Sequence, residues 1–188
     1  MRELPEARVW ADRALARFPR SADLLAARAV VQSRAGLVGD AMASSDEAIG
    51  APDASALTWA ARGEVLLEIS RTSAAACFQK AIEAGGRDPA VPAAIGRACA
   101  VRGLWTEALH YWRAAADRDA ANPMLMCWVG RCCEHLGDAV DARRAYTQAM
   151  LADPRCKPAR DALRDLDRAP IFRRLRRFLT RVRNRRRR

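Results

Sequence analysis

The sequence predicts an all-α fold in which antiparallel helix hairpins follow one another along the chain. Alanine recurs in two columns at steps of 34, 33, 34 and 34 residues, which indicates a repeating structural unit. Columns of small, turn and bulky residues keep the same register, so the repeat does not depend on abundant alanine alone. The alanine columns are Ala7, Ala41, Ala74, Ala108 and Ala142, and Ala14, Ala48, Ala81, Ala115 and Ala149. The other columns are Ala29, Gly63, Gly96 and Gly130; Gly36, Ser70, Gly103 and Gly137; and Phe78, Trp112 and Tyr146.

Each repeat is interpreted as two helices joined by a tight turn. A small residue midway along the first helix allows its partner to approach closely, and glycine permits the positive φ that ends that helix. The second helix carries alanine and a bulky residue at i and i+4 on one face. Because a single hairpin cannot bury both apolar stripes, neighbouring hairpins must stack into a continuous core.

The columns divide the chain into consecutive parts. Residues 1–20 are predicted to form a leading single helix that corresponds to the second half of a repeat. The parts that follow are four repeats at about 22–53, 56–87, 89–120 and 123–154, a capping helix at 155–169, and an Arg-rich segment at 170–188. Trp10 and Phe18 lie on this leading helix. One interpretation is that the helix is a terminal cap, since terminal repeats are commonly atypical. The other is that these two aromatic side chains bind a partner.

Residues 5–154 resemble the tetratricopeptide-repeat (TPR) family. The best-matching repeat carries Gly130, Gly137, Ala142, Tyr146, Ala149 and Pro154. In the first two repeats Ser45 replaces the bulky residue and Ser70 the turn glycine, so we expect looser packing there. The resemblance implies a right-handed superhelical array whose first helices line a concave groove. It also implies a protein-protein interaction scaffold that holds a peptide or helix of another protein in that groove.

The groove residues expected from this resemblance are Arg34, Glu64, Glu68, Arg97, Trp128, Arg131 and Glu134. Arg97 and Arg131 are 34 residues apart at equivalent positions, so adjacent helices would present two guanidinium groups to a carboxylate or an acidic peptide. Trp128 would add an aromatic anchor. The alternative is that Arg97 pairs with Glu64, and Arg131 with Glu134 or Glu68, as ordinary salt bridges. The lysine and asparagine set with which chaperone-binding TPR proteins clamp a terminal carboxylate is not present.

The formal net charge of +11 comes from the end of the chain, because residues 171–188 hold ten arginines and no acid. Apolar residues fall there at i, i+1, i+4, i+7, i+8 and i+11, which is typical of an amphipathic helix. The residues predicted to contact a membrane or polyanion are Phe172, Arg173, Arg174, Leu175, Arg176, Arg177, Phe178, Leu179, Arg181 and Arg183. The regular stripe favours attachment to an anionic membrane surface. Nucleic acid or another polyanion is the alternative, and a solvated basic terminus that folds back onto the last repeat is the third interpretation.

No catalytic motif is recognisable, and we expect a protein that is not an enzyme and needs no cofactor or small-molecule substrate. Cys127, Cys132, Cys133 and His135 lack the spacing of a zinc site, so packing explains them better than metal binding. The cysteines lie within helical patterns, which favours free thiols. Without a secretory signal or a long apolar run, we expect a cytoplasmic protein, peripheral at the inner face of a bacterial membrane if the basic segment binds lipid.

Overall fold

The structure is a computed structural model that describes residues 3–168 of the 188 in the chain. Every regular element in this range is an α-helix, which confirms the prediction of an all-α fold. The chain divides into two compact units between Arg118 and Asp119. The basic segment predicted at residues 170–188 lies outside the described residues, and no helix within them is long and apolar enough to cross a membrane.

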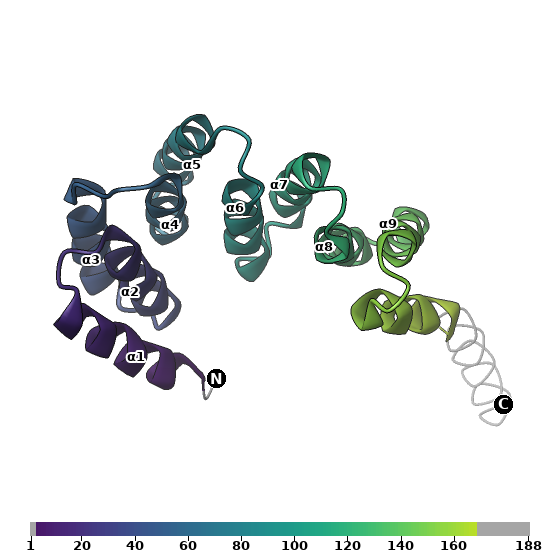
Figure 1. The fold of residues 1–188 in the computed structure, drawn as a ribbon, viewed down its shortest axis with the longest axis horizontal. Helices are drawn as coiled ribbons and strands as arrows, with labels where there is room; N and C mark the ends of the chain where they lie inside the picture. The colour runs from purple at the N-terminus through teal and green to yellow at the C-terminus, as the bar shows by residue number, and fades with distance from the viewer. Residues whose placement is uncertain (1–2, 169–188) are drawn as a thin grey trace, which may run out of the picture. The chain divides into compact units, whose positions relative to one another are not determined.

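The first unit contains a leading helix and three hairpins (Figure 1). The leading helix is α1 (Glu3–Arg17). The hairpins are α2 (Ala22–Arg34) with α3 (Val38–Gly50), α4 (Ala56–Leu66) with α5 (Arg71–Gly85), and α6 (Ala90–Val101) with α7 (Trp105–Arg118). The two helices of each hairpin make the most extensive contacts in this unit, as expected for stacked hairpins.

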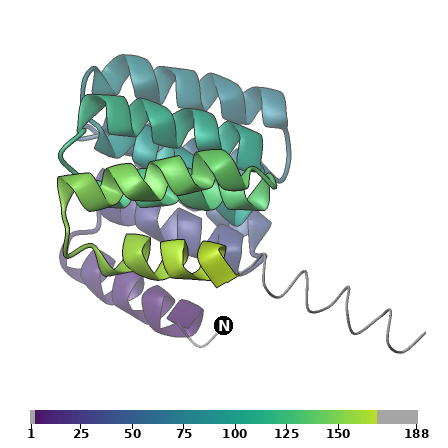
Figure 2. The ribbon, with the colours of Figure 1, turned by 90° about the vertical axis from the view of Figure 1, so that its right-hand side faces the viewer.

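The second unit contains a fourth hairpin followed by one more helix. The hairpin is α8 (Pro123–His135) with α9 (Ala139–Ala152). Residues 157–168 form the next helix, which is yellow-green in Figure 2 and follows α9 through a short loop. Cys156 at the end of this loop and Ala159 in the helix are buried, so the helix packs against the hairpin through a small apolar face.

Glycine and serine residues set the turns between the helices. Gly36, Gly103 and Gly137 have φ values of 79°, 73° and 82°, as the sequence predicts for the ends of α2, α6 and α8. Ser70 acts differently: it has extended backbone, and its hydroxyl accepts a hydrogen bond from the backbone N–H of Ser73 as the N-cap of α5. The second hairpin therefore turns without a left-handed residue.

Bulky side chains of the second helices pack directly on glycines of the first helices. A Cβ atom added to Gly63 would lie 2.3 Å from the Phe78 ring, and one added to Gly130 would lie 2.7 Å from the Tyr146 ring. Distances below 3.0 Å leave no room for a methyl group, so glycine is required for this approach. The second hairpin shows this contact as closely as the fourth, so the expected looser packing is not found there.

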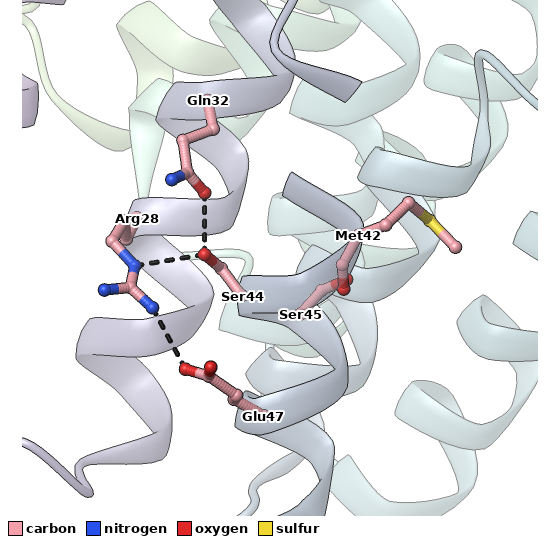
Figure 3. Close-up of polar contacts among 6 residues, drawn as sticks. All are labelled: Arg28, Gln32, Met42, Ser44, Ser45 and Glu47. Carbon is pink, nitrogen blue, oxygen red and sulfur yellow. Dashed lines mark hydrogen bonds and ion pairs between the residues drawn. The ribbon is translucent and has the colours of Figure 1, made fainter. Parts of the chain in front are cut away.

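The first hairpin has Ser45 at the position of the aromatic ring, and the neighbouring Ser44 joins its two helices through polar groups (Figure 3). Ser44 on α3 accepts a 3.0 Å hydrogen bond from Arg28 Nε and donates a 2.7 Å bond to Gln32 Oε1, both on α2. Arg28 also pairs with Glu47 at 3.0 Å. Gln32 and Ser44 are buried, and buried polar groups are stable when their hydrogen bonds are satisfied. Hydrogen bonds of Ser44 therefore join α2 to α3 in the hairpin that lacks the aromatic ring.

The leading helix α1 buries one face and exposes another. Ala11 and Leu15 lie in the core of the first unit, and Leu15 packs with Leu25 of α2. Trp10 is 68% exposed and Phe18 is 63% exposed. The Arg13 guanidinium carbon lies 5.8 Å from the centre of the Trp10 ring, so both aromatic side chains stay largely exposed with at most an arginine over them.

Candidate functional site

A groove of about 280 Å³ lies in the second unit between α8, α9 and the helix at residues 157–168. Its volume is just below the lower end of the range of small-molecule pockets, so it accommodates one or a few side chains of a larger ligand. The groove is lined by Met124, Cys127, Trp128, Arg131, Glu134, Tyr146, Pro158, Ala162 and Asp165. Three of the seven groove residues expected from the sequence, Trp128, Arg131 and Glu134, lie together in it.

One face of α8 forms the main wall of this groove. Met124, Cys127, Trp128, Arg131 and Glu134 follow the i, i+3, i+4, i+7 and i+10 spacing that aligns side chains on one helix face. Asn122 and Pro123 set the start of this helix: the Asn122 side chain accepts a 3.1 Å hydrogen bond from the Met124 N–H, and Pro123 occupies the first helical turn. The N-terminal cap thereby fixes the position at which this face begins.

Trp128 and Arg131 form the first pair in the groove. The Arg131 guanidinium carbon lies 5.4 Å from the centre of the Trp128 ring, within the range of a cation–π contact. Trp128 is half-buried and Arg131 is exposed. An indole ring and a guanidinium held together in this way offer an apolar surface next to a hydrogen-bond donor.

Glu134 and Tyr146 form the second pair. The Tyr146 hydroxyl donates a 2.6 Å hydrogen bond to Glu134 Oε2, while the ring of Tyr146 is buried against Gly130. Burial and the bond to Glu134 raise the pKa of the Tyr146 phenol well above its usual range. The phenol therefore stays protonated and holds the exposed carboxylate at the rim of the groove.

One thiol, that of Cys127, lines the groove, and a second thiol lies next to it in the core. Cys127 Sγ and Cys156 Sγ are 3.6 Å apart, and both side chains are buried. Burial, together with the hydrogen bond to Cys156, raises the pKa of the Cys127 thiol to about 12. These are protonated core thiols, and no group of three or more metal-ligating side chains occurs in residues 3–168.

The helix at residues 157–168 supplies the opposite wall. Pro158, Ala162 and Asp165 lie at i, i+4 and i+7 and line the groove from one helix face. Asp165 is exposed and forms no ion pair with another described residue. The charged side chains of the groove are thus two carboxylates, Glu134 and Asp165, and one guanidinium, Arg131.

The other four expected groove residues lie in the first unit. The Arg34 Nε atom is 2.7 Å from Glu64 Oε1, and the Glu64 side chain is buried. Glu68 pairs with Arg102, whose Nη2 also donates a 2.9 Å hydrogen bond to Ser33. The suggested pairing of Glu64 with Arg97 is therefore wrong, because Glu64 pairs with Arg34. Arg97 is exposed and forms no ion pair with a described residue, and the site with two adjacent guanidinium groups stays a prediction.

A second cavity, of about 490 Å³, lies in the first unit beside the α1–α2 loop and the end of α3. Its lining includes Pro19, Arg20, Glu47 and Pro52, and none of the groove residues expected from the sequence. It has no aromatic side chain to anchor a ligand. The groove of the second unit is therefore the better candidate for a binding site.

Besides Met124 on α8, sequence reasoning missed Tyr146, Pro158, Ala162 and Asp165 as groove residues. Tyr146 belongs to the column of core aromatics, and only the structure shows that its hydroxyl reaches the groove. The other three lie on the capping helix, where their i, i+4, i+7 spacing could have indicated a shared face. The residues predicted to contact a membrane or polyanion, Phe172 to Arg183, lie outside the described residues.

Comparisons with known proteins identify the fold only through solved structures. No family model matches the sequence, and no curated protein matches it. The crystal structure of YrrB, titled a TPR protein with an unusual peptide-binding site, matches with a TM-score of 0.52 and 20% identity over 86% of this chain and 84% of that chain. TTC0263, a thermophilic TPR protein of Thermus thermophilus, matches with a TM-score of 0.61 and 16% identity over 87% of this chain and 90% of that chain.

A third match has a peptide bound. The first TPR of Spaghetti (RPAP3), in complex with the HSP90 peptide SRMEEVD, matches with a TM-score of 0.50 and 18% identity over 62% of this chain and 93% of that chain. At these identities the likeness concerns the fold, and the ligands belong to the matched proteins.

Proposed function

Because this chain has the fold of the tetratricopeptide-repeat proteins, we propose that it is a protein-interaction scaffold that binds a peptide or helix of another protein. The observation that carries this proposal is the groove of the second unit, which half-buried Trp128 and the Arg131 guanidinium line together with residues of another helix. Buried aromatic and arginine anchors dominate the affinity of protein interfaces. Solved proteins of this fold bind peptides, which supports the same role here.

The proposed ligand is a short peptide segment rather than a metabolite. The groove is small and open to the surface, and its two walls run along helices, so it suits one or two side chains of an extended or helical segment. Trp128 would contact an apolar side chain of that segment, while Arg131 and Glu134 would bond to its polar groups. The proposal needs no cofactor.

A selection from a random twelve-residue peptide library tests this role with the full chain as bait. We expect enriched peptides whose affinity falls about thirty-fold for Trp128→Ala combined with Arg131→Ala, since a hot-spot residue contributes about 2 kcal/mol or more. Trp10→Ala combined with Arg13→Ala is the matched control, because it removes another exposed tryptophan with an arginine over its ring. Enriched peptides that bind the groove variant and the parent equally would contradict the proposed site.

The basic segment at residues 170–188 is proposed to attach the scaffold to an anionic membrane surface. Its support is the sequence alone: ten arginines, no acid and an apolar stripe at helical spacing. Each basic residue near such a surface contributes about 1 kcal/mol. Co-sedimentation with anionic and neutral vesicles, comparing the full chain with a version ending at Asp167, tests this. RNA that displaces the protein from vesicles would favour the polyanion alternative, and equal sedimentation of both versions would contradict both interpretations.

A further inference from the structure

The hydrogen-bonding groups that the groove of the second unit leaves open are mainly acceptors. The Tyr146 hydroxyl donates one hydrogen bond to Glu134 Oε2, so the remaining lone pairs of that carboxylate can accept further bonds. Asp165, on the other wall, is exposed and forms no ion pair with another residue in the described part of the chain. Because carboxylates accept hydrogen bonds and cannot donate them, an occupant that supplies donors matches both walls.

The charge of the groove favours the same kind of occupant. Arg131 is the single basic side chain among the described residues that line the groove, and Glu134 and Asp165 are both acidic. The Arg131 guanidinium is already engaged, since its carbon lies 5.4 Å from the centre of the Trp128 ring. An acidic side chain that enters the groove therefore meets more repulsion than attraction, and a basic side chain meets the reverse.

Glu134 also lies where a helix disfavours a carboxylate. It is the next-to-last residue of α8, where unpaired backbone carbonyls give the helix end a partial negative charge. An acidic side chain destabilises such an end, whereas a cation stabilises it. The hydrogen bond from Tyr146 holds the Glu134 carboxylate at this place, so a bound cation would interact favourably with both the carboxylate and the helix end.

Apolar surface lies beside the two carboxylates. Met124 and the Trp128 ring line the groove from α8, and Pro158 and Ala162 line it from the helix at residues 157–168. The methylene groups of an arginine or lysine side chain can cover such a surface while the charged end reaches an acceptor. A volume of about 280 Å³ leaves room for one such side chain and an apolar neighbour.

We propose that the peptide bound in this groove is basic: an arginine or lysine side chain binds to Glu134 and Asp165, and an adjacent apolar side chain packs on Trp128 and Pro158. The inference rests on the proposed peptide-binding function and names the chemistry of its ligand. Charge-assisted hydrogen bonds to the two carboxylates supply the selectivity, because such bonds are about twice as strong as those between neutral groups.

The sequences of peptides selected from the random library test the sign of the ligand. The full chain and its Trp128→Ala variant are used as baits in parallel, and peptides that only the parent enriches are counted as groove-dependent. The net charge of +11 attracts acidic peptides to both baits, so the comparison removes them. We expect arginine and lysine to be enriched about threefold or more among the groove-dependent peptides, with aspartate and glutamate depleted.

Neutral replacement of the two carboxylates measures their contribution to affinity. One groove-dependent peptide is titrated by fluorescence anisotropy against the parent and against Glu134→Gln with Asp165→Asn. Glutamine still offers an acceptor to the Tyr146 hydroxyl, so this variant removes charge and keeps side-chain shape. We expect it to weaken binding about tenfold. The control is Glu83→Gln with Asp117→Asn, two exposed carboxylates of the first unit, which should weaken binding less than about twofold.

Exchange of the basic residue of the peptide for glutamine completes a double-mutant cycle. This exchange should weaken binding to the parent about tenfold, but binding to Glu134→Gln with Asp165→Asn less than about twofold, because the interaction is already lost there. Urea denaturation provides a readout that separates binding from folding. Glu134→Gln should not lower the free energy of unfolding, since it removes a negative charge from the carboxyl end of α8 and keeps the acceptor for Tyr146.

The outcomes separate this inference from the proposed function. Groove-dependent peptides that are no richer in arginine and lysine than the library overturn the inference and leave the peptide-binding role in place. Basic peptides that bind the parent, the Glu134→Gln with Asp165→Asn variant and the control equally well also overturn it, because the two carboxylates then contribute nothing. A selection in which no enriched peptide depends on Trp128 contradicts the proposed function itself, and the inference fails with it.

Discussion

The hydroxyl group of Tyr146 on α9 lies 2.6 Å from Glu134 Oε2 on α8, so a core aromatic residue holds a carboxylate at the rim of the groove. The ring of Tyr146 packs on Gly130 of α8, and the glycine makes this approach possible. The same side chain therefore joins the two helices of the fourth hairpin and positions a groove residue. Packing of the repeat and geometry of the proposed site are coupled at this point.

Tyr146→Phe should keep the packing of the hairpin and lose the bond to Glu134. We expect the free energy of unfolding to fall by about 1 kcal/mol, the usual net contribution of one hydrogen bond, as measured by urea denaturation. Tyr111→Phe is the control, because the Tyr111 ring makes edge contacts with Phe78 and His110 that phenylalanine can keep. Equal effects of the two changes would show that the Tyr146–Glu134 bond adds nothing to stability.

The repeat columns predicted the all-α hairpin fold because the residue type in each column is the one that local packing requires at that position. Gly36, Gly103 and Gly137 recur where the turn needs positive φ, and Gly63 recurs where an aromatic ring approaches the helix backbone. These requirements act between residues close in the sequence, so a single sequence can reveal them. The face of α8 with Trp128, Arg131 and Glu134 was expected from the resemblance to the TPR family, and these three residues line one groove.

The partners of the charged residues could not be predicted in the same way. Glu64 pairs with Arg34, and Glu68 with Arg102, although the sequence placed Arg97 and Arg131 at equally plausible positions. Long side chains reach several neighbours, and small differences in helix packing decide among them. The polar contact in the first hairpin was also unexpected, because the pairing of buried Ser44 with Gln32 and Arg28 depends on side chains of two different helices.

Gly63→Ala should destabilise the first unit by about 1–3 kcal/mol. The added methyl group would lie 2.3 Å from the Phe78 ring, so the ring or the helix must shift, which is the cost of overpacking. Gly39→Ala in α3 is the control, because nothing lies within 4 Å of its added Cβ. We expect that change to be neutral or to stabilise by up to about 1 kcal/mol. Thermal unfolding followed by circular dichroism compares them, and similar destabilisation by both would contradict the close contact.

Arg34→Met should leave the buried Glu64 carboxylate without its ion-pair partner. Breaking a buried pair costs roughly 3–5 kcal/mol, and because Arg34 is itself 29% exposed we expect a smaller loss of about 2 kcal/mol. The exposed pair of Arg71 with Glu107, 3.9 Å apart, is the control, and Arg71→Met should change stability by less than about 0.5 kcal/mol.

The double variant Arg34→Met with Glu64→Leu tests the physical reason for the Arg34 effect. It removes both charges and keeps similar side-chain volumes, so it should recover most of the stability lost by the single change. Urea denaturation of the four combinations gives the coupling free energy. A double variant that is no more stable than Arg34→Met alone would show that the loss comes from packing rather than from an unpaired carboxylate.

The buried thiols should make the protein less stable in alkali. Burial raises the pKa of Cys132 to about 11, and burial with the Cys156 hydrogen bond raises that of Cys127 to about 12, from an ordinary value of 9.0. Above pH 9 the unfolded chain therefore loses protons that the folded chain keeps, so the free energy of unfolding falls as the pH rises from 9 toward 11 and 12. Tyr146, whose pKa is also raised, adds to this decline above pH 10.

Urea denaturation at pH 8, 9, 10 and 11 in the presence of a reductant measures the decline. Cys132→Ala should make it less steep, because the variant has one thiol fewer to ionise on unfolding, whereas Thr147→Ala at an exposed position of α9 should leave the slope unchanged. Iodoacetamide at pH 8 should modify Cys132 only when urea unfolds the chain, since the native thiol is fully buried. A slope that does not change in Cys132→Ala, or rapid labelling of Cys132 in the native protein, would contradict a protonated, inaccessible thiol in the core of the fourth hairpin.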